Sequence, residues 1–72
     1  MEKTERTELK LFRIRKKLTQ DQIAEKLGYS RGQYARFENG DADTTLRFLQ
    51  ALEKAFDIPF VEAQRITLRD NE

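Results

Sequence analysis

The chain has 72 residues, the length of a single domain, and a domain of this size buries only about 60% of the surface that its unfolded chain exposes. It contains neither Cys nor His, which excludes a disulfide framework and removes the usual general base and the commonest metal ligand. We therefore expect no metal, no cofactor, no small-molecule ligand and no enzymatic activity. No apolar run approaches the roughly 18 residues of a membrane span, and the charged N-terminal stretch does not resemble a signal peptide, so we expect a cytoplasmic protein without a membrane partner.

The net charge of +1 conceals an uneven distribution along the chain. The segment from residue 10 to residue 36 holds eight basic and two acidic residues, a charge of +6, whereas the remainder holds six basic and eleven acidic residues, a charge of −5. The basic residues of that segment are Lys10, Arg13, Arg15, Lys16, Lys17, Lys26, Arg31 and Arg36. Such polarity indicates one face for a polyanion. A merely solvated charged face is the alternative.

The first predicted helix begins near Thr4 or Thr7 and runs to about Lys16. Leu9 and Phe12 are three residues apart and mark an inward face. A second face carries Leu11, Ile14 and Leu18, so this helix either packs on two sides or meets a partner. No segment alternates with period two, and we predict no strand anywhere.

Two capping boxes follow in close succession and predict the starts of the second and third helices. Thr19 pairs with Gln22, and Ser30 pairs with Gln33, each in the spacing that satisfies two backbone N–H groups. Gly28 stands where a helix ends in the left-handed conformation. Because the connection is so short, the two helices must cross steeply, which is the helix-turn-helix arrangement.

The third predicted helix has two unlike faces and closes at Asn39-Gly40. Tyr34 and Phe37 point inward. The opposite face lacks large apolar residues and carries Gly32, Ala35, Arg36 and Asn39, with Arg31 at its leading edge.

The rest of the chain predicts two further helices. Thr45 is a good N-cap for a fourth helix that holds Phe48, Leu49, Leu52 and Phe56. Pro59 can open a fifth, short helix that runs to about Ile66. We expect residues 1–6 and 68–72 to be frayed.

One run of residues in the first half of the chain keeps a familiar pattern: Leu18-Thr19-Gln20, Ile23-Ala24-Glu25-Lys26-Leu27-Gly28, Ser30-Arg31, Tyr34 and Arg36-Phe37-Glu38-Asn39-Gly40. This run resembles the lambda-repressor/Cro-like helix-turn-helix family, the XRE-type transcriptional regulators, and the resemblance extends from Leu9 to Ile66. The resemblance implies a compact all-α domain of five helices that spans residues 1–72, with helices two and three as the helix-turn-helix and helix three in the major groove of DNA.

The same resemblance assigns roles to individual positions. It implies that Arg31, Gly32 and Arg36 face base edges, and arginine is the side chain best suited to guanine. It places Gln20, Ser30 and Asn39 at DNA phosphates, and Arg13 with Glu38 in a salt bridge. An unpaired carboxylate at Glu38 would be costly, which favours the pairing independently. A phosphate contact remains the alternative for Arg31, an ion pair with Asp or Glu within the fold for Arg36, and a plain surface position for Gln20.

Two positions depart from the family pattern. Gly32 stands where a side chain often reads a base, and it weakens the helix by about 1 kcal/mol relative to Ala, although it could allow close backbone approach to DNA. Residues 41–43 are acidic where family members often carry basic residues. Lys16 and Lys17 could supply the missing phosphate contacts from the first helix.

The leading functional hypothesis is a sequence-specific regulator, a repressor, that binds double-stranded DNA as a homodimer. Surplus apolar residues at the end of the chain predict the dimer interface: Phe60, Val61, Ile66 and Leu68. Some of the four must instead close the open end of the core, and Ile66 is the first candidate for that role. The alternative is a protein-interaction module such as the antitoxin of a toxin–antitoxin pair. The short tail after the fifth helix counts against the antitoxin.

Overall fold

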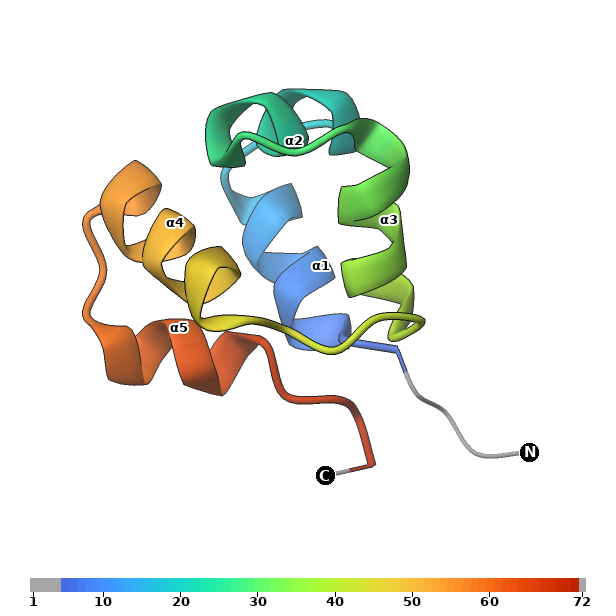
Figure 1. The fold of residues 1–72 in the computed structure, drawn as a ribbon, viewed down its shortest axis with the longest axis vertical. Helices are drawn as coiled ribbons and strands as arrows, with labels where there is room; N and C mark the ends of the chain where they lie inside the picture. The colour runs from blue at the N-terminus through green and yellow to red at the C-terminus, as the bar shows by residue number, and fades with distance from the viewer. Residues whose placement is uncertain (1–4, 72) are drawn as a thin grey trace.

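The computed structural model describes residues 5–71, and all regular structure in that range is helical (Figure 1). This confirms the all-α prediction, with five helices and no strand among the described residues. The helices are α1 (Thr7–Arg15), α2 (Gln20–Leu27), α3 (Arg31–Asn39), α4 (Leu46–Phe56) and α5 (Phe60–Ile66).

Local capping residues set the ends of α2 and α3 as predicted. The Thr19 hydroxyl accepts a hydrogen bond from the Gln22 amide at 3.1 Å, and the Gln22 side chain accepts one from the Thr19 amide at 2.9 Å. Ser30 and Gln33 form the same reciprocal box at the start of α3. Gly28 adopts a φ of 80°, the left-handed conformation that glycine adopts without strain. Both helices therefore begin and end where the chain itself dictates.

The start of α1 is held differently, by a residue from the other end of the chain. No side chain next to Thr7 caps this helix. Instead, the Thr7 amide donates to Asp70 Oδ1 at 2.9 Å, and the Asp70 amide donates to the Glu5 carbonyl at 2.8 Å. Arg6 is only 2% exposed. The frayed ends expected for residues 1–6 and 68–72 therefore differ from the structure at Glu5, Arg6 and Asp70, while residues 1–4 and 72 lie outside the described range.

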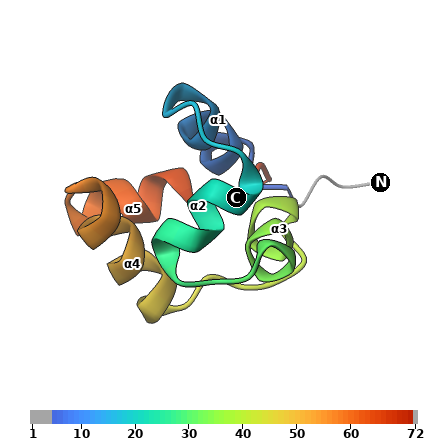
Figure 2. The ribbon, with the colours of Figure 1, turned by 90° about the horizontal axis from the view of Figure 1, so that it is seen from above.

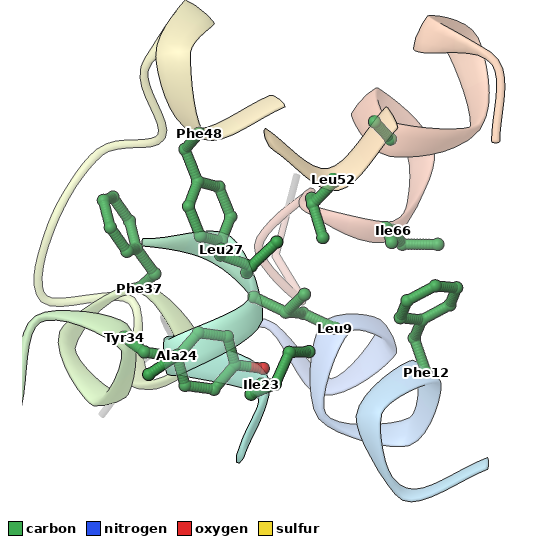
Figure 3. Packing of buried hydrophobic residues seen from close by; sticks show 11 residues of the cluster. Leu9, Phe12, Ile23, Ala24, Leu27, Tyr34, Phe37, Phe48, Leu52 and Ile66 are labelled. Atoms are coloured by element: carbon green, nitrogen blue, oxygen red, sulfur yellow. The ribbon is translucent and has the colours of Figure 1, made fainter. Parts of the chain in front are cut away.

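The helices surround one core, with α3 on one side and α4 and α5 on the other (Figures 1 and 2). Figure 3 shows that apolar side chains from all five helices meet between them. The rings of Phe37 and Phe48 stack with centroids 4.2 Å apart, which ties α3 to α4. The buried apolar residues are Leu9, Phe12, Ile23, Ala24, Leu27, Tyr34, Phe37, Phe48, Leu52, Ala63 and Ile66.

The four residues predicted for the dimer interface do not lie on one surface. Ile66 is 1% exposed and belongs to the core, so its place in that interface is wrong. It closes the core against α1, because α5 packs across the end of the bundle. Phe60 is half-buried, whereas Val61 and Leu68 are 68% and 49% exposed. Val61 and Leu68 thus remain as the accessible apolar residues of the predicted set.

Candidate nucleic-acid interface

The outer face of α3 presents the residues expected to meet DNA bases. Gly32, Arg36 and Asn39 recur at helical spacing and are exposed, and Arg31 is exposed in the first turn. The opposite side of the helix is anchored by Tyr34 and Phe37 in the core. An α-helix with its side chains is about 10–12 Å in diameter, which fits a major groove about 12 Å wide. The face can therefore enter the groove without disturbing the core.

Gly32 sits in open space on this face. A Cβ built on Gly32 would meet nothing within 4 Å, so no packing within the protein requires a glycine here. The absent side chain leaves the backbone of α3 accessible to a surface that approaches it.

The N-terminal end of α3 combines a local cap with a positive dipole end. Ser30 is exposed, and its hydroxyl accepts from the Gln33 amide at 3.2 Å. The side-chain oxygen of Gln33 in turn accepts a hydrogen bond from the Ser30 amide at 3.0 Å, so this oxygen is engaged in the cap. The partial positive charge of the helix end favours a phosphate close to Ser30.

The pair predicted between Arg13 and Glu38 forms one polar network with Gln20, which was predicted to contact phosphate. Arg13 Nε lies 2.9 Å from Glu38 Oε2, and Arg13 Nη2 donates to Glu38 Oε1 at 3.3 Å, so the pair is bidentate. Gln20 Nε2 donates to the same Oε1 at 3.2 Å. Arg13 also donates to the Leu18 carbonyl at 2.9 Å. The network thus connects α1, α2 and α3 at one point.

Burial and hydrogen bonding act in opposite directions on the Glu38 carboxyl. Burial would raise the pKa of Glu38, but the Arg13 guanidinium, with help from Tyr34 and Gln20, outweighs burial and lowers it. Burial also raises the pKa of the Tyr34 phenol, and the adjacent Glu38 carboxylate adds to that shift. Tyr34 therefore stays neutral while Glu38 stays charged, and the pair with Arg13 persists at neutral pH.

A pocket of about 220 Å³ lies beside this network, on the side where α2 begins. Gln20 and Asn39, both predicted phosphate contacts, line it together with the cationic Lys10 and Arg13. Gln20 is half-buried, and its hydrogen bond to Glu38 fixes its amide at the start of α2. The structure therefore brings two predicted phosphate contacts to one polar site that also includes Lys10, which sequence reasoning did not single out.

The two lysines expected to supplement phosphate binding have different surroundings. Lys16 Nζ lies over the ring of Phe12 at 5.3 Å and over that of Phe56 at 6.0 Å. Phe56 ends α4, on the side of α1 opposite α3 (Figures 1 and 2), so the structure does not bring Lys16 to the α3 face. Lys17 is exposed and follows α1 with a φ of 59°.

Two arginines at the ends of the chain contact the C-terminal end of α3, and sequence reasoning missed both. Arg6 donates to the carbonyls of Phe37 and Ala42 at 2.6 and 2.8 Å. Arg69 donates to the Gly40 carbonyl at 3.3 Å and pairs with Asp43 at 2.7 Å. Backbone carbonyls occur at every residue, so nothing in the sequence marks which ones an arginine will reach.

Arg69 also bears on the acidic connection after α3. Because the guanidinium of Arg69 hydrogen-bonds the Asp43 carboxylate, it holds the pKa of that carboxyl below its ordinary value. One of the two acidic charges between α3 and α4 is thereby paired within the protein.

The comparison with known families agrees with this geometry. The chain matches the helix-turn-helix family over residues 9–62, about three quarters of its length. The chain therefore belongs to the XRE/lambda-repressor-like helix-turn-helix family, and α2 and α3 are its helix-turn-helix. Members of this family are DNA-binding transcription regulators and are not typically enzymes. A search of curated proteins found no match.

Residues 5–71 contain neither a membrane-spanning helix nor a cluster of metal-ligating side chains. None of the helices there is long and apolar enough to cross a membrane. No group of three or more acidic or other metal-ligating side chains gathers in that range.

Proposed function

We propose that the protein is a sequence-specific repressor that binds a roughly palindromic operator as a homodimer, with α3 in the major groove. The observation that carries this proposal is the exposed outer face of α3. Arg31 and Arg36 project from it, Gly32 leaves space between them, and the other side is anchored in the core. A helix with these properties can read base edges through the two arginines, each bidentate contact contributing about 1–3 kcal/mol of discrimination.

Phosphate binding on either side of the groove would set the register of the helix. Gln20 and Asn39 share the polar pocket with Lys10 on one side of α3, and Ser30 lies at its N-terminal end. Contacts to phosphates position a protein without reading sequence. This division predicts that Gln20 and Arg36 have distinct effects on DNA binding.

The dimer follows from the exposed apolar residues at the end of the chain. Val61 lies in the first turn of α5 and Leu68 lies two positions after its end, and both are exposed. Two protomers joined there by a two-fold axis would present two copies of α3, and operator half-sites lie about 34 Å apart. Occupancy of such an operator is sufficient for repression if the operator overlaps a promoter.

Selection of bound duplexes from a random pool, followed by titration at several salt concentrations, tests DNA binding. We expect a palindromic consensus with guanine in each half-site. If a dimer neutralises roughly eight phosphates, log affinity should fall against log salt with a slope of about −7. A slope near zero on every duplex would contradict the proposal. Once a consensus is found, a reporter with that operator inside its promoter distinguishes repression from activation.

Sedimentation of a Val61→Ser, Leu68→Ser double variant tests the dimer. Leu46→Ser is the matched control, because Leu46 is 61% exposed but lies at the start of α4. We expect the wild type and the control to sediment as dimers and the double variant as a monomer. A double variant that remains dimeric would place the interface elsewhere, with the Leu11 and Ile14 face of α1 as the next surface to test.

A further inference from the structure

We infer that Arg6 is a positioning residue for α3, through what we name the terminal clasp: residues 5–7 together with residues 67–70. The clasp holds the C-terminal end of α3, and the loop that follows it, in the orientation needed to read DNA sequence. This inference rests on the proposed function and assigns a role to residues outside the helix-turn-helix.

The Arg6 side chain joins three segments at the centre of the clasp. Its Nη1 donates to the carbonyls of Phe37, in the last turn of α3, and of Ala42, in the loop. Its Nε donates to the Thr67 carbonyl, just after α5, at 2.7 Å. Its own amide donates to the Glu38 carbonyl at 2.8 Å. A buried cation at the C-terminal ends of two helices also interacts favourably with both helix dipoles.

The C-terminal segment completes the clasp from the other side. Asp70 accepts hydrogen bonds from the amide and the hydroxyl of Thr7. Arg69 donates to the carbonyl of Gly40, the C-cap of α3, and pairs with Asp43 in the loop. The family match covers residues 9–62, so both parts of the clasp lie outside the matched region.

The terminal clasp affects sequence reading because it contacts the C-terminal end of α3. Arg36 and the exposed Asn39 lie in the C-terminal half of α3. At the end of that half, Arg6 and Arg69 donate hydrogen bonds to the carbonyls of Phe37 and Gly40. A bidentate contact with guanine requires hydrogen bonds of narrow length and angle. Contacts with phosphates carry no sequence information and tolerate a shift in orientation better. A loosened clasp should therefore weaken operator binding more than it weakens non-specific binding.

The ratio of operator affinity to affinity for an unrelated duplex separates positioning from stability. A residue that only stabilised the fold would change the folded fraction, which lowers both affinities by the same factor and leaves the ratio unchanged. A positioning residue changes the ratio itself.

The test measures that ratio for Arg6→Lys and for Asp70→Ala. Arg6→Lys keeps the charge but loses the planar fork that reaches three carbonyls. Asp70→Ala removes the exposed side-chain contacts between Asp70 and Thr7 and leaves the core intact. Arg65→Lys, in an exposed arginine of α5, is the matched control. We expect the ratio to fall about tenfold for Arg6→Lys and about threefold for Asp70→Ala, and to stay constant for Arg65→Lys.

Each possible affinity ratio either supports or overturns the inference. A ratio that stays at the wild-type value in both clasp variants overturns the inference, even if both affinities fall. If Arg6→Lys does not fold, Asp70→Ala decides alone, since a lowered ratio supports the clasp and an unchanged one refutes it. A wild-type protein with no preferred sequence would overturn the proposed function, and this inference with it, whereas a selective wild type with unchanged variants would overturn this inference alone.

Discussion

The two ends of α3 are held in different ways. The N-terminal end is capped by Ser30 and Gln33, which are its immediate neighbours in the chain. The C-terminal end is held by Arg6, which is 31 positions from Phe37, and by Arg69, which is 29 positions from Gly40. The start of the helix is thus a local property of the sequence, whereas the orientation of its end depends on the assembled fold. Substitutions at the two ends of α3 test this difference.

The largest effect is expected from Glu38→Ala, in the C-terminal half of α3. Removal of one partner from a buried ion pair leaves Arg13 without its carboxylate and should cost about 3–5 kcal/mol in the free energy of unfolding. In a domain this small that loss could unfold most of the population, which thermal denaturation would detect.

A double replacement is the control for that prediction. Arg13→Met with Glu38→Leu removes both charges and should recover much of the stability, because well-packed apolar side chains of similar volume can substitute for a buried pair. A melting temperature that Glu38→Ala leaves unchanged would show that the pair contributes nothing.

Acidification should affect the same end of the helix. The pKa of Glu38 is lowered in the folded state relative to its ordinary value of 4.5. Its contribution to stability is therefore fully present above that ordinary value and is lost as the pH falls through the lower, folded-state value. Denaturant titrations from pH 7 to pH 3 should show a steeper loss for the wild type than for Glu38→Gln, and parallel curves would contradict the assignment.

Arg36→Ala should leave stability unchanged and alter sequence preference. The side chain is exposed, and we expect loss of about 1–3 kcal/mol of discrimination at one base pair in each half-site. Gln20→Ala is the comparison, because it should weaken binding to specific and non-specific duplexes alike. If Arg36→Ala weakens all sequences equally, Arg36 contacts phosphate and not a base.

Ser30→Ala tests the local cap at the other end of α3. Loss of the hydroxyl that accepts from the Gln33 amide should cost about 1 kcal/mol of stability. Thr45→Ala is a matched control, since the Thr45 hydroxyl caps α4 in the same way and lies outside the helix-turn-helix. Both variants should lose similar stability, while only Ser30→Ala should also weaken DNA binding.

The smallest effect is expected from Gly32→Ala. The position is helical and open, so alanine should raise stability by about 0.5–1 kcal/mol through its higher helix propensity. An unchanged or lowered melting temperature would contradict this expectation. Operator affinity measured on the same variant shows whether the backbone of α3 must approach the DNA closely at this point.

Features that depend on neighbouring residues were predictable from the sequence, whereas features that depend on the assembled fold were not. The capping boxes at Thr19 and Ser30 and the left-handed Gly28 were predictable, because each depends on residues within a few positions of one another. The inward faces of Tyr34 and Phe37 follow from helical spacing. For the four apolar residues at the end of the chain the sequence left two roles open, and only the packing of α5 across the bundle decides that Ile66 is buried while Val61 and Leu68 remain outside.

Local sequence sets where α2, α3 and α4 begin, which faces of the helices are apolar, and which basic residues stand on the outer face of α3. Those properties depend on short-range hydrogen bonding and on the helical repeat. Only the tertiary structure shows that Gln20 joins Arg13 at Glu38, that Lys16 lies on the side of α1 away from α3, and that Arg6 and Arg69 meet at the end of α3. These contacts involve backbone carbonyls and long flexible side chains. Their partners depend on distances in the folded molecule, so no pattern along the chain predicts them.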